Sequence, residues 1–352
     1  MKKLFIFAAL AFGLVSCQND TNIFGVEVTP DEKPVEYTIS VGIPELDQTR
    51  AGYTNSGEGA IANGVLDDAN VTLRYILGVY IYDTTTSTYK LAGSHHTEYS
   101  DGRSVDFKPT LIPDRKYNFV VWVDIVTRTA ADQPWVNDLY NVNDLAAITI
   151  NDANWKPMDE KRDAFTGFTT VDDITASVGT PTSPITVNCT RPFAKVRVIT
   201  KDMAVMQDFG IVPSKAEIRY ATSYRHKFNA TTGEYTDADV ANIKTHGMFA
   251  IADYSSNGNV EGKALFTDYL FAPYGTDVIG FTMDVYDSTD KLIKSTTFST
   301  DIPVKRNTLT TITGNFLTLQ DVNLQVNVEN EGSFTGEDGI KDNSDDEITK
   351  EL

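Results

Sequence analysis

Long runs of β-branched and aromatic residues, separated by short polar turns, constrain this chain more than any other feature. Residues 71–82 form one such run and residues 116–126 form another. The second run places Phe119, Val121 and Val123 on one face of a strand, because alternate side chains of a strand point to the same side. Strands of this kind, joined by turn residues and with little helix signal, favour antiparallel sandwiches over a parallel sheet. We therefore predict an all-β fold.

The strand pattern continues through the second half of the chain. Further strand-like runs occupy residues 186–200, 215–223, 265–272, 278–286, 292–298 and 308–319, with a last short strand around 324–328. Pro181 and Pro184 lie between the two halves and indicate an irregular connection there. We expect two antiparallel β-sandwich domains in tandem, over residues 35–182 and 183–330.

Only two short segments carry a helix signal. Residues 142–148 contain Asn143 and Asp144, either of which suits a helix N-cap. Residues 202–209 stop before Gly210, a residue typical of helix C-termini. Both helices would be short, so we expect few helical residues in the fold.

The N-terminus has the pattern of an export signal. A basic start leads into an apolar run over residues 4–15, which is short for a transmembrane helix. The run closes with Leu14-Val15-Ser16-Cys17, which resembles the bacterial lipobox. We expect residues 1–16 to be a lipoprotein signal peptide and Cys17 to carry palmitate-type acyl chains that anchor the protein. The alternative is an ordinary signal peptide with a chance cysteine.

Two polar segments flank the expected domains. Residues 17–34 have few large apolar side chains and are expected to form a tether. Residues 331–352 hold eight acidic residues and two lysines, which predicts a disordered acidic tail. The whole chain has a formal net charge of −19, which excludes nucleic acid as a natural partner.

The chain contains 2 cysteines. If Cys17 is lipidated, Cys189 is left alone and no intrachain disulfide forms, although an exported protein could hold one. Cys189 follows a strand-like run, so we expect a buried small side chain and not a reactive thiol.

The sequence offers few groups suited to catalysis. His95 and His96 are adjacent, so on a strand they would face opposite sides. His226 and His246 have no carboxylate or cysteine at metal-ligand spacing. The motifs of zinc metalloproteases, serine hydrolases and P-loop proteins do not occur. We predict no enzymatic activity, no catalytic residue, no metal and no cofactor.

The three tryptophans are the candidates for stacking against a sugar. Trp122 lies in the middle of a predicted strand, which favours a place in the core. Trp135 and Trp155 lie in predicted loops and could touch a ligand. A hydrophobic plug beneath a loop is the commoner role for such a side chain.

Two turns match a short O-glycosylation signal of Bacteroides-type bacteria. These are Asp83-Thr84-Thr85 and Asp287-Ser288-Thr289. The acceptors would be Thr84 and Ser288. The signal has only three residues, so its support for an exported protein is modest.

The order of these features resembles a known family. A lipobox, a tether, a strand over residues 35–43 and Thr49-Arg50-Ala51 precede the two β-domains, and a strand over residues 305–318 closes them. That closing strand reads Lys-Arg-Asn at its start and has Gly-Asn near its end. The layout resembles the fimbrillin-like lipoproteins of Bacteroidales, which include major and minor fimbrial subunits and their anchors.

The resemblance implies transthyretin-like or Greek-key sandwiches and a role in type V pili. In that family a trypsin-like protease cuts after an arginine behind the first strand, and a strand of another subunit takes the vacated place by β-augmentation. Arg50 occupies the position of the cleavage site. Residues 35–43 would be the displaced strand, and residues 308–328 of a neighbour would supply the donor.

The resemblance also implies a location and partners. The protein would be lipid-anchored and exposed on the cell outer membrane, or part of the fimbrium, with other fimbrial subunits as partners by strand addition. The acidic tail is an awkward donor ending, so an anchor or accessory subunit is as compatible as a repeating stalk.

Two other classes of function stay open. A surface glycan-binding lipoprotein of a polysaccharide-uptake system would share the lipobox and the sandwiches, although three dispersed tryptophans do not favour it. A glycosidase would need a pair of carboxylates, and no acidic pair stands out from the acidic background.

Overall fold

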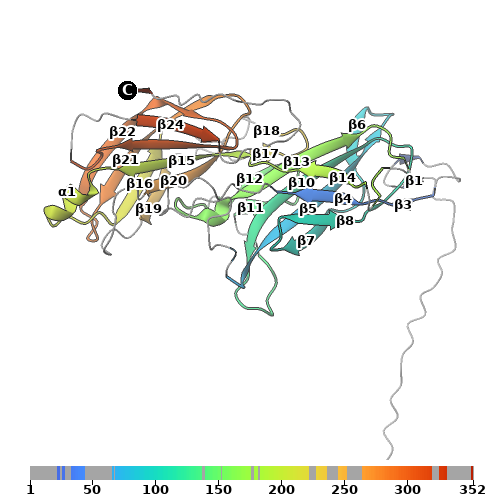
Figure 1. The fold of residues 1–352 in the computed structure, drawn as a ribbon, viewed down its shortest axis with the longest axis horizontal. Helices are drawn as coiled ribbons and strands as arrows, with labels where there is room; N and C mark the ends of the chain where they lie inside the picture. Colours follow the sequence, from blue (N-terminus) through green and yellow to red (C-terminus); the bar gives the residue numbers. More distant parts are fainter. Residues whose placement is uncertain are drawn as a thin grey trace, which may run out of the picture.

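The computed structural model is built mainly from β-strands and has an elongated shape (Figure 1). It describes residues 22–23, 26–27, 33–43, 66, 68–136, 139–151, 153–175, 178–180, 183–221, 227–235, 245–251, 264–318, 325–330 and 350–351. One α-helix, α1 (Met203–Asp208), and a 3-10 turn, η2 (Glu160–Arg162), accompany the strands in these ranges. No helix there is long and apolar enough to cross a membrane. The prediction of an all-β fold is confirmed.

The first half of the chain supplies the following strands: β1 (Asn22–Ile23), β2 (Val26–Glu27), β3 (Val35–Glu36), β4 (Ile39–Gly42), β5 (Val71–Asp83), β6 (Thr88–Leu91), β7 (His96–Ser100), β8 (Ser104–Phe107), β9 (Thr110–Leu111), β10 (Tyr117–Thr127), β11 (Tyr140–Asn141), β12 (Ile148–Ile150), β13 (Ala164–Val171) and β14 (Ile185–Asn188). One sheet has the order β13-β10-β5-β6, with β7 also paired to β5. A second sheet has the order β14-β4-β8, and short ribbons pair β1 with β2 and β3 with β9. The two larger sheets bury one hydrophobic cluster between them, which we call the first core.

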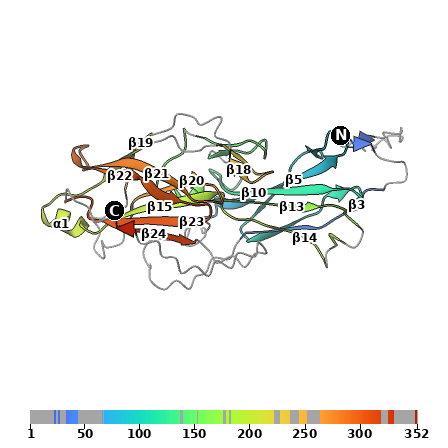
Figure 2. The same cartoon turned by 90° about the horizontal axis from the view of Figure 1, so that it is seen from above.

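The second half adds two more sheets. Its strands are β15 (Phe193–Thr200), β16 (Lys215–Tyr220), β17 (Lys227–Asn229), β18 (Glu234–Tyr235), β19 (Thr245–Ala250), β20 (Ala264–Phe271), β21 (Asp277–Tyr286), β22 (Leu292–Val304), β23 (Thr308–Gly314), β24 (Gln325–Asn330) and β25 (Lys350–Glu351). The sheets have the orders β20-β15-β23-β24-β25 and β19-β16-β21-β22. Helix α1 lies at the end of the molecule opposite β3 in both ribbon views (Figures 1 and 2).

Strands β5 and β10 are buried on both faces, which explains their nearly continuous apolar runs. On β5, Tyr75 and Leu77 point into the first core. Ile76 and Tyr80 point to the other side, into a larger cluster that we call the shared core. A strand buried on both faces loses the alternation of apolar and polar residues that a half-exposed strand shows.

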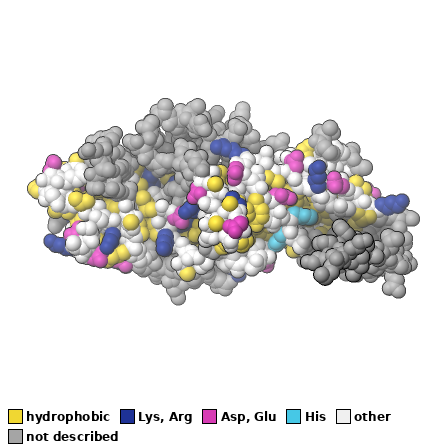
Figure 3. Space-filling model, turned by 90° about the horizontal axis from the view of Figure 1, so that it is seen from below, with side chains coloured by type: hydrophobic (Ala, Val, Ile, Leu, Met, Phe, Trp, Pro, Cys, Tyr) yellow, Lys and Arg dark blue, Asp and Glu magenta, His cyan; other side chains and the backbone are white. Residues whose placement is uncertain are grey.

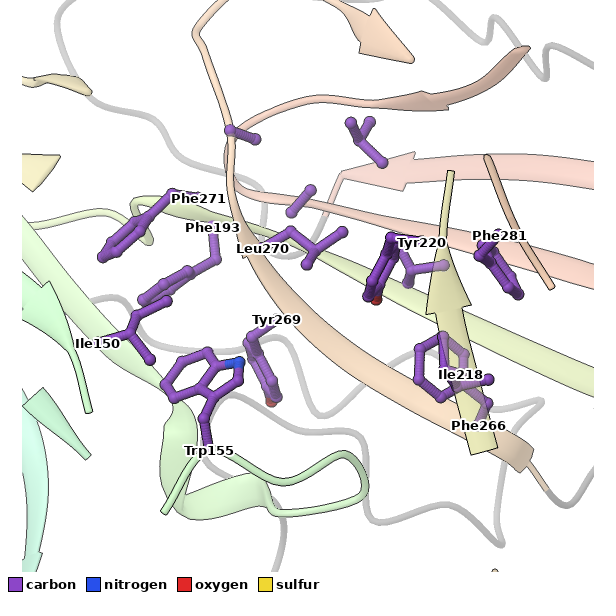
Figure 4. Packing of buried hydrophobic residues seen from close by; sticks show 14 of the residues in the cluster. Ile150, Trp155, Phe193, Ile218, Tyr220, Phe266, Tyr269, Leu270, Phe271 and Phe281 are labelled. Atoms are coloured by element: carbon purple, nitrogen blue, oxygen red, sulfur yellow. The ribbon is translucent and has the colours of Figure 1, made fainter. Parts of the chain in front are cut away.

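The shared core joins the two halves of the chain. Ile150 and Trp155 of the first half pack beside Phe193, Tyr269 and Phe271 of the second half (Figure 4). The rings of Phe193 and Phe271 are stacked with centroids 4.5 Å apart. A four-stranded sheet, β11-β12-β17-β18, also contains strands from both halves. The two sandwiches are therefore packed through common hydrophobic contacts and a common sheet.

The position of β14 bears on the predicted domain limits. Residues 185–188 pair in parallel with β4, and Val187 lies in the first core. The next strand, β15, belongs to the second half. We therefore propose that the division between the domains falls at residues 189–192, a few residues after the limit of 182/183 drawn from the prolines.

The two predicted helices had different outcomes. The helix expected at residues 202–209 is present as α1, and Gly210 follows it with a positive φ of 69°. The helix expected at residues 142–148 is absent, and that prediction was wrong. There the Asp144 carboxylate accepts a hydrogen bond from the Ala146 N–H at 2.9 Å, which closes a turn between β11 and β12.

Candidate functional site

Strand β4 lies in the middle of its sheet. It pairs in parallel with β14 on one side and antiparallel with β8 on the other. Ile39, for example, lies opposite Ile185 on β14 and opposite Phe107 on β8. Because both edges of β4 are hydrogen-bonded, its removal would leave an open slot between two strands.

Every second side chain of β4 and its flanking residues points into the first core. Tyr37, Ile39, Val41 and Ile43 are 2%, 0%, 0% and 6% exposed and all lie in the first core. Burying one such side chain contributes about 1.5–3 kcal/mol, so these four contribute on the order of 6–12 kcal/mol as an upper estimate. The slot is therefore an apolar groove with four side-chain positions.

Hydrogen bonds close both ends of the strand. The Thr38 N–H donates to the Gly179 carbonyl at 2.5 Å, and the Ile43 N–H donates to the Arg103 carbonyl at 3.0 Å. On the β14 side, the Cys189 N–H donates to the carbonyl of Gly42 at 2.9 Å. A strand that takes the place of β4 must satisfy the same backbone groups.

Tyr37 and Gly179 form a close contact at the start of the strand. Gly179 has a φ of 74°, and a Cβ added there would lie 2.7 Å from Cδ1 of Tyr37. Burial, and to a smaller extent the nearby charge of Asp114, raises the pKa of the Tyr37 phenol. Glycine is required here both for the backbone conformation and for the space that the Tyr37 ring occupies.

Cys189 lies against the other end of β4. Its side chain is free, wholly buried and part of the first core. Burial raises the pKa of its thiol far above the usual value. The prediction of a buried small residue is confirmed, and the position makes this thiol a reporter of whether the groove is filled.

Cys17 and Arg50 lie outside the described residues. The structure describes the chain up to Ile43, directly after β4, and again from Leu66. Arg50 therefore belongs to the connection that follows the candidate groove strand. Its cleavage, and the lipidation of Cys17, stay predictions.

Thr84 and Ser288 both lie exposed in hairpin turns, after β5 and after β21. The Asp83 carboxylate accepts from the N–H of Thr85 at 2.8 Å, and the Asp287 carboxylate accepts from the N–H of Thr289 at 2.8 Å. Each aspartate thus has a structural role in its turn. O-glycosylation at the two neighbouring hydroxyls stays a prediction, and the positions are accessible to a modifying enzyme.

The three tryptophans have three different environments. Trp122 is 0% exposed and Trp155 is 3% exposed, so both are core residues. Trp155 also stacks on the guanidinium of Arg162, with 3.6 Å between the Arg162 Cζ atom and the ring centroid. Trp135 is partly exposed and stacks on Tyr99.

A buried ionic network lies near Trp155, in a region that the sequence predicted only as a loop. Arg162 and Asp268 form an ion pair with both side chains 0% exposed, and the hydroxyl of Tyr220 donates to the same carboxylate. Arg191 pairs with Asp163 in bidentate fashion at 2.7 and 2.8 Å. The partners are far apart in sequence, so no local pattern could have signalled them.

No three histidine, cysteine, aspartate or glutamate side chains gather as a metal site in the part of the chain that the structure describes. His95 and His96 are neighbours, His96 on β7 and His95 just before it. The feature best suited to a function is thus the groove that β4 fills.

Comparison with solved structures shows similarity to fimbrial proteins at low identity. The tip fimbrial protein Mfa3 of Porphyromonas gingivalis, with a C-terminal truncation, has a TM-score of 0.42 and 10% identity, over 84% of this chain and 100% of that chain. A fimbrial assembly protein of Parabacteroides distasonis has a TM-score of 0.38 and 14% identity, over 84% and 96% of the two chains. The fimbrial anchor protein Mfa2 of Porphyromonas gingivalis has a TM-score of 0.37 and 12% identity, over 84% and 100%. Likeness at this level does not assign a role.

No curated protein matches the sequence. One family model matches residues 29–350, which include both halves of the fold and the candidate groove. Because this match covers most of the chain, the protein belongs to the family of unknown function DUF6562.

Proposed function

We propose that the protein is a surface-exposed lipoprotein that serves as a structural, anchor or accessory subunit of a fimbrium, assembles by strand exchange and supports adhesion. The observation that carries this proposal is the central position of β4 between β14 and β8. The first strand of the two larger sheets, β4, thus fills the middle of its sheet, and the connection that follows it contains Arg50.

Cleavage after Arg50 changes what holds β4 in place. The cut removes the covalent link from β4 to β5, so the strand is retained only by its hydrogen bonds and by the burial of its apolar face. If β4 leaves, the edges of β8 and β14 are unpaired and the apolar groove meets water. A donated strand with apolar residues at alternate positions satisfies both the backbone groups and the groove.

The strands at the C-terminal end differ in their fitness as donors. Strand β23 lies between β15 and β24, and six of its seven residues are buried, so it cannot be donated without opening the second sandwich. Strand β24 pairs with β23 along its length but with only two residues of β25. In sequence, Leu324, Val326 and Val328 alternate with polar residues. We therefore propose residues 324–330 of a neighbouring subunit as the donor, in place of the longer range 308–328.

The anchor and the location follow from the N-terminal sequence. Lipidation at Cys17 would hold the chain on the outer membrane, and residues 18–34 would link the lipid to β3 and β4. A subunit that keeps β4 would stay attached to the membrane, whereas a subunit cut after Arg50 would lose its anchor together with the strand. In this proposal, cleavage of the peptide bond after Arg50 in the cell distinguishes a stalk subunit from an anchor.

Limited digestion of the folded protein with trypsin tests the proposal. We expect an early cut after Arg50, ahead of most of the other basic sites, because strands protect their peptide bonds. A polymerising subunit then releases residues 35–43 and forms SDS-resistant oligomers, whereas an anchor or accessory subunit keeps the strand and stays monomeric.

The control for this digestion is the Arg50→Ala protein, which should form no oligomers under the same conditions. Reaction of the Cys189 thiol with a colorimetric reagent reports the filling of the groove in parallel. A first cut inside the folded halves, with the bond after Arg50 left intact, would contradict the proposal.

A further inference from the structure

A row of three side chains crosses one face of the large sheet in the first half. Asp124 on β10, Arg74 on β5 and Tyr99 on β7 lie directly opposite one another in the strand register. Directly opposed residues of antiparallel strands point to the same face. This face is the one opposite the first core, because Tyr75 of β5 points into that core.

The charge of Arg74 is compensated within the fold. Its Nε and Nη2 atoms donate to the two oxygens of Asp124 at 3.0 and 2.7 Å. The indole N–H of Trp122 also donates to Asp124, at 3.0 Å. Asp124 is wholly buried and Arg74 has 16% of its side chain exposed. The guanidinium is therefore held in one orientation and presents no net charge at the surface.

Arg74 forms part of the wall of a depression of about 650 Å³. The other lining residues are Tyr140, Asn141, Val142, Asn143, Thr149, Ile150, Asn151 and Ala153. Among these described residues, three carry side-chain amides, two carry hydroxyls and none carries a carboxylate. Amides and hydroxyls both donate and accept hydrogen bonds, which suits a ligand that bears many hydroxyl groups.

An exposed aromatic pair adjoins this depression, because Tyr99 is the cross-strand partner of Arg74. Tyr99 is 46% exposed, and its ring lies nearly parallel to that of Trp135, with centroids 6.1 Å apart and an angle of 25°. Arg128 lies 4.2 Å from the centroid of Trp135 and donates to the carbonyls of Ala131 and Ala69. These contacts hold the aromatic pair in place without covering Tyr99.

We propose that the Tyr99 ring and the adjoining amide-lined depression bind a neutral saccharide, with the ring stacked against the apolar face of a pyranose and the asparagines bonded to its hydroxyls. The preference for a neutral sugar follows from charge. Acidic and basic side chains are mixed on the surface in Figure 3, while the whole chain has a net charge of −19, which repels polyanionic glycans. Binding at this place is independent of strand exchange.

Isothermal titration calorimetry of the full-length protein with maltohexaose, mannohexaose, xylohexaose and hexagalacturonate tests this site. We expect at least one of the three neutral sugars to bind, and hexagalacturonate to bind more weakly. Tyr99→Ala should weaken the affinity for the neutral sugar by about tenfold or more, as expected for loss of an aromatic anchor. Asn143→Ala, at an exposed position of the depression, should weaken this affinity by a smaller but measurable factor.

The matched control is Phe209→Ala, because Phe209 is a 74% exposed aromatic residue next to α1 in the other half of the protein. It should leave sugar binding unchanged. Thermal unfolding of each variant separates loss of the site from loss of the fold. The proposal is overturned if none of the three neutral sugars binds, if hexagalacturonate binds best, or if Tyr99→Ala binds as well as the unaltered protein.

Discussion

Ile39 of β4 lies directly opposite Ile185 of β14, in a parallel pair that joins the start of the first sandwich to its last strand. Their side chains are 0% and 4% exposed. The chain must therefore run through nearly the whole first half before both partners of β4, β8 and β14, exist. This arrangement makes β4 an element that fills a site prepared by the rest of the first sandwich.

Shortening a groove side chain should weaken the fold. Ile39→Ala removes a wholly buried side chain from the first core, and we expect it to lower the free energy of unfolding by about 2–5 kcal/mol. Ser40→Ala, on the other face of the same strand, should cost less than about 1.5 kcal/mol, because its hydroxyl donates an exposed hydrogen bond to Asp106. Urea denaturation of the two variants measures the difference, and equal losses would contradict the burial of Ile39.

Two glycines with similar backbone angles allow the stability cost of backbone conformation to be measured separately from that of packing. Gly179 and Gly210 have φ values of 74° and 69°. A Cβ at Gly210 would meet nothing within 4 Å, whereas one at Gly179 would meet the ring of Tyr37. We expect Gly210→Ala to cost about 1–2 kcal/mol for the backbone alone, and Gly179→Ala to cost about 1–3 kcal/mol more. Thermal unfolding would refute this view of the Tyr37 contact if the two variants were equally stable.

The buried pair of Arg162 and Asp268 should be sensitive to loss of one partner. Arg162→Met leaves the Asp268 carboxylate buried without its cation, and we expect a loss of about 3–5 kcal/mol in chemical denaturation. The exposed pair of Lys215 and Asp290, with 36% and 56% of the side chains exposed, provides the control. Lys215→Met should change the stability by less than about 1 kcal/mol. A small effect of Arg162→Met would show that water reaches the pair.

Asp202 should make the second half sensitive to acid. Burial opposes ionisation of this carboxyl, but hydrogen bonds from Thr200, Thr318 and the N–H of Leu317 outweigh it and lower its pKa. Because the pKa in the folded state is below that in the unfolded state, the stabilisation is present above the ordinary value of about 4 and is lost as the pH falls below it. Asp202→Asn should therefore reduce stability at pH 7 and have a smaller effect at low pH. A constant effect across a pH series of melting temperatures would contradict this role.

Local patterns were enough to predict most of the long strands, although β13 and β19 were missed. The runs over residues 71–82 and 278–286 became β5 and β21 nearly as expected, because apolar alternation and turn chemistry act within a few residues. The predicted helix at residues 142–148 failed because its capping residue, Asp144, also suits a turn. Leu145, inside that turn, is buried in the shared core, so tertiary packing favoured the turn.

The features that matter most for function could not be predicted from local patterns. The central place of β4 depends on a parallel partner far along the chain. The burial of Arg162 depends on Asp268, in the other half. The stack of Tyr99 and Trp135 joins a strand to a loop, so sequence alone left Trp135 with several possible roles.

The central claim is that β4 occupies a groove from which another strand can displace it once the bond after Arg50 is cut. The most direct measurement is uptake of an isotopically heavy synthetic peptide of residues 33–50, followed by mass spectrometry of the protein under conditions that keep it folded. We predict that the trypsin-cut protein exchanges its own strand for the heavy peptide and that the uncut Arg50→Ala protein takes up none. A cut protein that retains its original strand and takes up no heavy peptide would contradict this claim and leave only the role of an anchor or accessory subunit that keeps β4.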